Sequence, residues 1–389
     1  MQLVAYGAQD IYLTGNPQIT FFKVVYRRHT NFSMESIEQT FNGSADWGKK
    51  VSATISRNGD LIHKVYLEVT VATPNNIDSW VKRVGHALIK EVEVEIGGQR
   101  IDKHYGLWMQ IWSELSSTKN QKLLLDKLVG GDVTAAGGSH AAVGATWYIP
   151  LQFWFCKNPG CALPLIALQY HEVKINITFR PIIELLIASD NLGAHGAVSF
   201  NASLYVDYIY LDTDERRRFA QVSHEYLIEQ LQFTGEETLR SSHTLNFNHP
   251  VKELVWVSRT DGATSVGSSD TSSGENDWFN FTNSGANPTD NVKLQLNGHD
   301  RFSERKAGYF NWVQPYQHHT GCPSVGVNVY SFGLTPEEHQ PSGTCNMSRI
   351  DNASMKFGTA AGSCKVSIFA VNYNVLRIMS GMGGLAYSN

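Results

Sequence analysis

Regular alternation of apolar and polar side chains constrains the fold of this 389-residue sequence more than any other feature. Leu61–Ala72 alternates along its whole length, and Leu88–Ile96, Glu172–Phe179 and Ser203–Leu211 repeat the pattern. A period of two indicates a half-buried β-strand, because successive side chains of a strand point to opposite faces. Many short strands separated by turns, with few helices, predict an all-β sandwich or barrel.

Runs of β-branched and aromatic residues predict further strands, and the first of these, Ile19–Tyr26, is expected to be buried or nearly so. The others are Ser36–Phe41, Lys50–Ile55, Trp147–Phe155, Tyr226–Phe233, His243–Phe247, Val251–Ser258, Val292–Leu296, Val325–Phe332, Ser348–Phe357 and Lys365–Tyr373. Apolar residues at helical spacing predict a short amphipathic helix in Lys103–Ser116 and a second helix in Thr118–Val129. Ala135–Gly144 and Thr260–Asn276 are predicted loops, rich in Gly and small or polar residues.

The sequence also contains a weak internal repeat. Val94–Trp108 and Leu294–Phe310 each begin with an alternating strand, pass a Gly turn and charged residues, and end on Gly-aromatic. Tyr205–Leu211 and Phe369–Leu376 form a second pair, in the same order along the chain. The repeat favours duplication of one β-sandwich domain, with chance similarity among β-rich segments as the alternative. Asp212–Gln221, where a helical turn is expected, is the predicted linker.

Composition restricts the classes of partner. Charged residues make up 17% of the chain, below the usual value of about a quarter, and nine Trp are present, so much of the surface is expected to lie against partners. The net charge is −4 and Met1–Asn16 contains no Lys or Arg, so no direct nucleic-acid binding is expected. Neither a transmembrane helix nor a signal peptide is expected, and the five Cys are expected to remain reduced.

No catalytic, cofactor-binding or metal-binding residue is predicted, and no cofactor. A group of His and Cys residues suggests a zinc site, but it lacks the closely spaced Cys pairs of structural zinc sites. The residues are His318, His319, Cys322, His339 and Cys345. Glu337-Glu338 is interpreted as a solvated loop, and Gly381–Gly384 as a flexible turn. Arg216-Arg217-Arg218 has acidic neighbours, which favours a linker turn that forms salt bridges between domains or to a neighbouring subunit over nucleic-acid contact.

Four long strings resemble the major capsid proteins of nucleocytoplasmic large DNA viruses, most closely those of algal viruses and their giant-virus relatives. The strings are Leu3–Phe32, Asn246–Val257, Val329–Ala353 and Val371–Asn389, so the resemblance covers essentially the whole chain. It implies a double jelly roll: two tandem eight-stranded antiparallel jelly rolls with short helices in loops. The division expected is an N-terminal arm (1–18), a first jelly roll (19–212), a linker (213–221) and a second jelly roll (222–389).

The resemblance also implies a structural role without enzymatic activity. The chain would form homotrimeric, pseudo-hexagonal capsomers of an icosahedral shell, beside neighbouring capsomers and minor capsid or penton proteins. It would be made and assembled in the host cytoplasm and reside in the virion; whether an internal membrane lies close to the shell is left open. The alternative from another class is a glycan-binding or glycan-cleaving β-sandwich protein, which would need converging carboxylates and exposed aromatic residues and usually a secretion signal.

Overall fold

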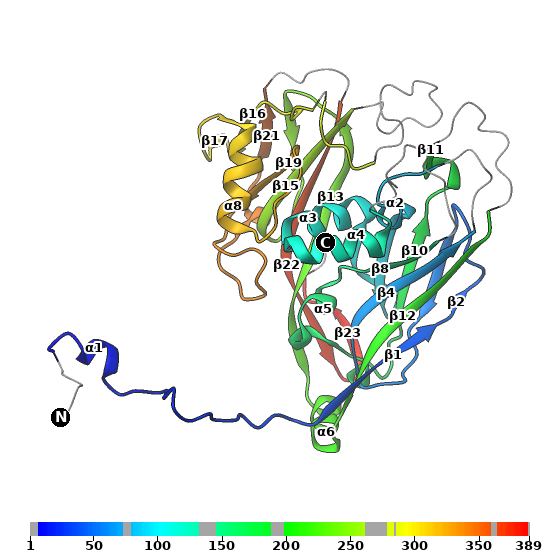
Figure 1. Ribbon diagram of the computed structural model, residues 1–389, viewed down its shortest axis with the longest axis vertical. Coiled ribbons are helices and arrows are strands. Elements are labelled where there is room, and N and C mark those ends of the chain that lie inside the picture. The colour runs from blue at the N-terminus through cyan, green and yellow to red at the C-terminus, as the bar shows by residue number, and fades with distance from the viewer. Residues whose placement is uncertain are drawn as a thin grey trace.

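The computed structural model describes residues 7–72, 79–131, 145–187, 198–260, 278–283, 285–358 and 364–387. The strands fall into two groups, which we call the first half (residues 32–211) and the second half (residues 224–385). Each half contains two larger sheets, and all strand pairs in the described residues are antiparallel. The halves lie side by side, and residues 7–31 extend away from both (Figure 1).

The first half packs one sheet of order β1-β12-β4-β8 against another of order β2-β3-β10-β6-β7. The strands of the first sheet are β1 (Phe32–Gln39), β12 (Phe200–Leu211), β4 (Leu61–Val71) and β8 (Ala145–Pro150), with β9 (Leu163–Pro164) also on β4. Those of the second are β2 (Phe41–Asn42), β3 (Lys50–Thr54), β10 (Val173–Phe179), β6 (Ile89–Ile96) and β7 (Gln99–Tyr105). A small extra sheet joins β5 (Ser79–Trp80) to β11 (Leu186–Ile187).

The second half repeats this arrangement with a sheet of order β13-β22-β15-β19 and another of order β14-β21-β16-β17. The first contains β13 (His224–Thr238), β22 (Cys364–Met379), β15 (Pro250–Thr260) and β19 (Val327–Ser331), with β20 (Cys345–Asn346) and β23 (Met382–Leu385) at its margins. The second contains β14 (Ser242–Thr244), β21 (Ala353–Phe357), β16 (Asn291–Leu296), β17 (His299–Asp300) and β18 (Arg305–Lys306). No sheet of the described residues contains strands from both halves.

The internal repeat of the sequence corresponds to equivalent positions in the two halves. The first pair of similar segments contains the hairpins β6–β7 and β16–β17, which turn at Gly97-Gly98 and at Asn297-Gly298. All four turn residues have positive φ, as a two-residue turn of type I′ requires. The second pair belongs to β12 and β22, each the second strand of its sheet. The predicted all-β fold with two similar sandwiches is confirmed.

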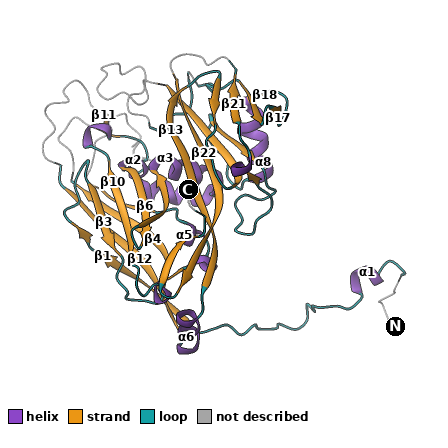
Figure 2. Ribbon diagram, turned by 180° about the vertical axis from the view of Figure 1, so that it is seen from behind, coloured by secondary structure: helices purple, strands orange, loops and turns teal. Residues whose placement is uncertain are grey.

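Helices fill the connections between strands (Figure 2). The first half contains α2 (Val84–Leu88), α3 (Gly106–Ser116), α4 (Lys119–Val129), α5 (Trp154–Lys157) and the 3-10 turns η1 (Pro159–Cys161), η2 (Leu165–Ala167) and η3 (Ile182–Glu184). The predicted linker is α6 (Thr213–Gln221), and Asp212 caps it by accepting a hydrogen bond from the Thr213 N–H. The second half contains the π-helical turn η4 (Tyr309–Val313), α8 (Gln314–His318) and η5 (Met347–Arg349), and the arm contains α1 (Ile11–Thr14).

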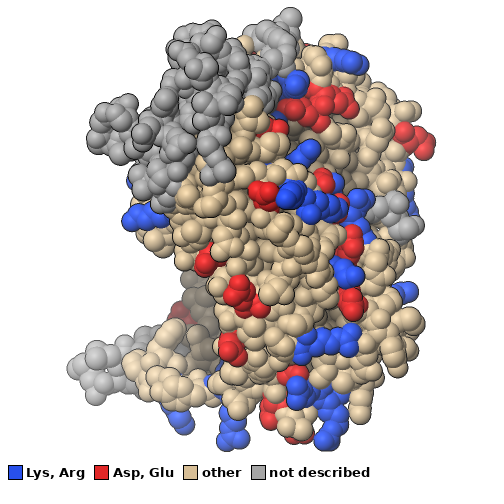
Figure 3. Space-filling model, turned by 90° about the vertical axis from the view of Figure 1, so that its right-hand side faces the viewer, with Lys and Arg blue, Asp and Glu red and all other residues tan. Residues whose placement is uncertain are grey.

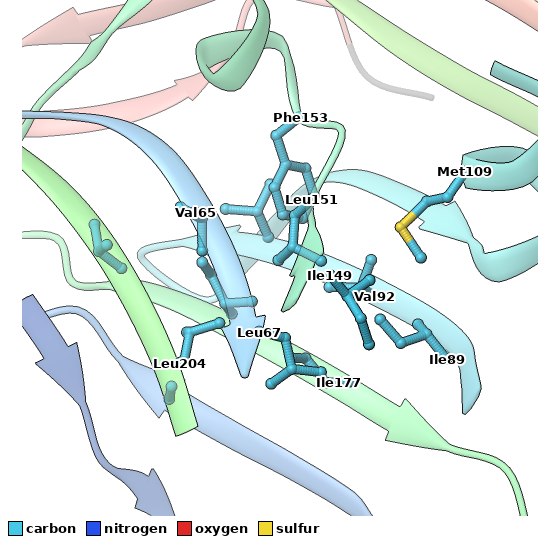
Figure 4. Close-up of a cluster of buried hydrophobic side chains, with 14 of the residues drawn as sticks. Val65, Leu67, Ile89, Val92, Met109, Ile149, Leu151, Phe153, Ile177 and Leu204 are labelled. Carbon is cyan, nitrogen blue, oxygen red and sulfur yellow. The ribbon is translucent and has the colours of Figure 1, made fainter. Parts of the chain in front are cut away.

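The core of each half lies between its two sheets, as alternation requires. In the first half, Val65, Leu67 and Leu204 of one sheet meet Val92 and Ile177 of the other, and all five are buried (Figure 4). The second core contains the buried indole of Trp256 against Phe310, with ring centroids 5.1 Å apart. Aromatic rings also contribute to the first core, where Phe153, Phe155 and Phe179 are buried.

Several local predictions differ from the structure. Ile19–Tyr26 is not a buried strand: it is exposed and pairs with no described strand, because no sheet edge lies beside it. Trp147–Phe155 is a strand only to Pro150, since α5 begins at Trp154. Gly381–Gly384 is not a flexible turn: residues from Met382 onward belong to β23, and a Cβ on Gly381 would lie 2.6 Å from the Tyr170 ring. The arm includes the four-residue helix α1, and the predicted loops 135–144 and 260–276 lie outside the described residues except at Thr260, which ends β15.

Candidate functional site

Residues 7–31 form an N-terminal arm that is exposed along almost its whole length (Figures 1 and 2). Its side chains include many large apolar groups, and Phe22 is 97% exposed. The segment 19–26 is rich in β-branched and aromatic residues and has no neighbouring strand in the described chain. Apolar surface of this extent is unfavourable in water, and it marks a segment suited to contact with another chain.

Helix α3 joins the two halves. It begins at Gly106, where a Cβ would lie 2.0 Å from the His86 carbonyl oxygen, so the close approach to α2 requires glycine. Its sequence was predicted to be amphipathic, but all residues from Gly106 to Leu115 are buried, because the second apolar face packs against the second half. This contact, the inter-half junction, consists of Leu107, Trp108, Ile111, Trp112 and Leu115 against Val255, Val257, Val327, Val329, Phe369 and Val371.

A buried charge cluster lies beside the junction. The Glu229 carboxylate of β13 accepts hydrogen bonds from Lys157 of α5, at 3.0 Å, and from Lys252 of β15. Burial would raise the pKa of Glu229, but the two ammonium groups overcome it and lower the pKa to about 2. Lys157 also lies 4.2 Å from the centre of the Trp112 ring. The cluster therefore connects both halves through a carboxylate that stays ionised.

A second buried pairing involves His319, which follows α8. Its ring nitrogens lie 3.1 Å from Glu253 Oε2 and 3.0 Å from Glu337 Oε1. Burial alone would lower the pKa of His319, but the two carboxylates raise it to about 9. The ring is therefore an imidazolium held between two carboxylates. Glu337 is thus not merely a solvated loop residue, because it helps to stabilise a buried cation.

Asp102 of β7 links the edge of one half to the edge of the other. Its carboxylate accepts hydrogen bonds from the N–H groups of Leu231 on β13, at 3.2 Å, and of Lys103, at 2.9 Å. The Gln230 side chain donates to the Ile101 carbonyl beside it. Burial raises the pKa of Asp102 to about 7, against the opposing effect of the two N–H donors. An open cleft of about 380 Å³ lies at this edge, lined by Arg100, Asp102, Lys103, Tyr105, Gln232 and Phe233 among others.

The residues considered for zinc do not converge. Within the described ranges, no group of three or more His, Cys, Asp or Glu side chains could hold a metal ion. His318 contacts the Leu334 carbonyl, Cys322 is exposed, and the ring of His339 lies 3.1 Å from Cys161 Sγ. None of the five Cys forms a disulfide, and burial raises the pKa of Cys156 to about 12, which disfavours the reactive thiolate.

One charged side chain of the linker, that of Arg216, binds within the first half. Arg216 Nε donates to Asp60 Oδ1 at 2.7 Å, so this arginine fixes α6 to the first half. Within the single chain, the prediction of a bridge between the two domains is wrong for Arg216, because the arginine pairs with the buried Asp60 carboxylate of the first half. No helix of the described residues has the length and apolar character needed to span a membrane.

The sequence did not reveal Asp102, Glu229 or Lys252 as buried charges. Lys252 lies in a stretch expected to be an ordinary strand, and its burial depends on cover from residues far away in sequence. The nearest signal is the pair Lys252-Glu253 inside an otherwise apolar run. Such a pair indicates either an exposed edge or a satisfied buried pair, and only the fold distinguishes them.

Comparison with known proteins identifies the family. Residues 20–212 match the family described as "Major capsid protein N-terminus", and residues 215–384 match "Large eukaryotic DNA virus major capsid protein". The chain is 58% identical to the major capsid protein of Pyramimonas orientalis virus, over all of this chain and 99% of the relative. It is 45% identical to that of Paramecium bursaria Chlorella virus 1, again over 100% and 99%.

Solved structures agree in fold. A chain of the PBCV-1 virus capsid superposes with a TM-score of 0.81 at 41% identity, covering 95% of this chain and 100% of that one. The Faustovirus major capsid protein gives a TM-score of 0.78 at 14% identity, covering 96% and 94%, and supports the double jelly roll fold alone. The chain therefore belongs to the major capsid proteins of large eukaryotic DNA viruses, and its role in the icosahedral capsid is structural and not enzymatic.

Proposed function

We propose that this capsid protein functions as a homotrimer whose six jelly rolls form a pseudo-hexagonal capsomer. The repeated strand order carries the proposal: β1-β12-β4-β8 of the first half matches β13-β22-β15-β19 of the second. Three copies around a threefold axis place six similar domains in one ring. A closed ring of this kind needs a single heterologous interface repeated three times.

The surface composition suits burial in such a ring. The 17% charged fraction leaves wide uncharged areas, and on the face in Figure 3 acidic and basic side chains are interspersed among them. Obligate interfaces bury on the order of 2,000 Å² or more and are held largely by apolar contact. The trimer should therefore withstand high salt, since salt screens charge pairs and not apolar burial.

We propose a division of the chain that follows these contacts. The first jelly roll ends at residue 212, the linker spans 213–221 and the second jelly roll begins at 222. The expected arm of residues 1–18 is extended to residue 31, because 19–31 are exposed and β1 begins at Phe32. The arm binds another part of the capsid, and its exposed apolar side chains support this role.

The remaining partners follow from the place of the protein in the virion shell. We propose contacts with neighbouring capsomers and with minor capsid or penton proteins, and assembly in the host cytoplasm. No direct genome contact is proposed, because the net charge is −4 and Met1–Asn16 has no basic residue. No catalytic, cofactor or metal site is assigned.

Light scattering on the purified protein tests the trimer. The expected mass is about 130 kDa, three times the 43.3 kDa of one chain, at both low and high salt. The measurement is made at about 0.05 M and 1 M salt, where the screening length falls from more than 10 Å to about 3 Å. A stable monomer, or a trimer that dissociates as salt rises, contradicts the proposal.

A further inference from the structure

We propose that η4 and α8 of one copy pack on the outer face of the β4-β12-β8 sheet of the next copy, as α3 packs on the second half within one chain. The inference rests on the proposed trimer and names its interface. Its basis is that the chain contains one example of this contact, and that the two surfaces needed for a second example are not covered by any of the described residues.

The two helical segments occupy equivalent places. Helix α3 follows the strand β7 that ends the second sheet of the first half, and η4–α8 follows β18 at the same point of the second half. Their burial within their own half has the same spacing. Met109, Gln110, Ser113 and Glu114 are buried in α3, and Phe310, Asn311, Gln314 and Pro315 are buried in η4–α8. This spacing aligns the segments with an offset of 201 residues.

The opposite face of each segment is apolar, but it is buried in α3 and exposed in η4–α8. In α3, Ile111, Trp112 and Leu115 are buried against the second half. At the same offset, η4–α8 presents Trp312, Val313 and Tyr316, of which Trp312 is 68% exposed and Tyr316 is 90% exposed. Trp312 is therefore not a core residue in the single chain. An exposed Trp and Tyr one turn apart are typical of an interface anchor.

The receiving surfaces are equivalent as well. On the second half, β15 is buried on both faces, because α3 covers Val255 and Val257. Its counterpart β4 is buried on one face only, and Lys64, Tyr66, Glu68 and Thr70 point outward. Phe369, which contacts Trp108 of α3 at 5.3 Å between ring centroids, corresponds to Tyr205 in the sequence repeat.

Tyrosines cover this outer face of the first half. Tyr205 stacks on Tyr66 at 5.2 Å, and Tyr148 of β8 lies 6.3 Å from Tyr66. Tyrosine combines a large apolar area with a polar tip, so it suits a surface that is wet in the free chain and covered in the assembly. The equivalent positions of the second half, which are covered permanently by α3, carry Val and Phe instead.

Charge also matches across the proposed contact. Glu38 and Glu68 flank the tyrosines and raise the pKa of Tyr205, and together with Lys64 of the same face they leave a net negative charge. Arg305 and Lys306 of β18 are exposed beside η4, and the Arg305 guanidinium lies 4.2 Å from the centre of the Tyr309 ring. α8 lies on one side of the molecule and the β1-β12-β4 sheet toward the other (Figure 1), as a head-to-tail ring requires.

Paired substitutions test the anchor. The W312S/Y316S variant should keep the folded subunit, because both side chains are exposed, and should raise the dissociation constant of the trimer by roughly 100-fold or more. Y170S removes a comparably exposed Tyr away from the proposed contact and serves as control. Mass is measured by light scattering over a dilution series. An unchanged trimer in W312S/Y316S overturns the assignment.

Cross-linking between copies tests the pairing itself. In a background with the exposed Cys322 replaced (C322S), the variant Y205C/W312C is treated with a short bismaleimide and run on a denaturing gel. A covalent trimer is expected for the double variant and none for Y205C or W312C alone. A dimer from W312C alone would mean a twofold contact and would overturn the inference. A wild-type monomer refutes the trimer itself, whereas a trimer that does not cross-link refutes only this interface.

Discussion

Replacing Asp102 with Asn should stabilise the protein at neutral and alkaline pH and have little effect at acidic pH. The carboxyl is buried between β7 and β13, and burial raises its pKa to about 7 from the ordinary 3.8. Between these two values the unfolded chain is ionised while the folded chain still holds the proton. Folded-state stability is therefore lost as the pH rises through this window and is fully present below it.

The magnitude follows from the width of the window. Each pH unit inside this window costs about 1.4 kcal/mol, so between pH 4.5 and the folded-state pKa of about 7 the wild type loses about 3 kcal/mol that D102N keeps, and the loss does not grow further up to pH 8. The amide oxygen of Asn can still accept the hydrogen bonds from Leu231 and Lys103. For a chain of 389 residues, this difference corresponds to about 4 °C in Tm.

The assay compares thermal unfolding of wild type, D102N and D351N at pH 4.5 and pH 8. Asp351 is exposed, so D351N controls for the loss of one negative charge. The advantage of D102N over wild type should grow by about 4 °C between the two pH values, while that of D351N should not. An equal Tm difference for D102N at both pH values would refute the claim that burial of this carboxyl opposes its ionisation.

Three further predictions concern the contacts between the halves and the arm. K252M leaves the buried Glu229 with only Lys157, so stability should fall by about 3–5 kcal/mol; a chemical denaturation midpoint equal to wild type would count against the cluster. W112A leaves a cavity in the inter-half junction and should cost about 3–5 kcal/mol, with faster limited proteolysis within 213–221; unchanged proteolysis would show that the junction does not restrain the linker. Deletion of Met1–Asn16 should leave the capsomer folded but impair assembly into particles, and a subunit that unfolds would mean that the arm is a core element.

The alternation of apolar and polar residues correctly predicted the strands that have one solvent-exposed face. β4, β6, β10 and β12 lie within three residues of their predicted bounds, because one face of each packs in the core and the other does not. The pattern fails in β15, whose two faces are both buried. There the charges of Lys252 and Glu253 meet partners from distant segments, and periodicity carries no information about such partners.

The sequence alone did not show which aromatic residues lie in the core and which lie at an interface. Trp112 and Trp312 occupy adjacent positions on equivalent segments, yet one is buried and the other exposed, because a sheet of the same chain covers α3 whereas no described element covers Trp312. The same reason explains Ile19–Tyr26, which has a strand-like composition but no partner strand among the described residues. The sequence pattern shows that a segment is apolar enough to be buried, but it does not show which surface covers the segment.

Imaging the purified capsomer by cryo-electron microscopy tests the central claim most directly. The account predicts a threefold ring of six similar sandwich domains, alternating first and second half, with α8 of each copy on the β4-β12-β8 sheet of the next. The two kinds of contact around the ring, α3 on its own second half and α8 on the neighbour, should then look alike. A twofold particle, an isolated subunit, or a threefold ring in which Trp312 and Tyr316 face solvent would contradict it.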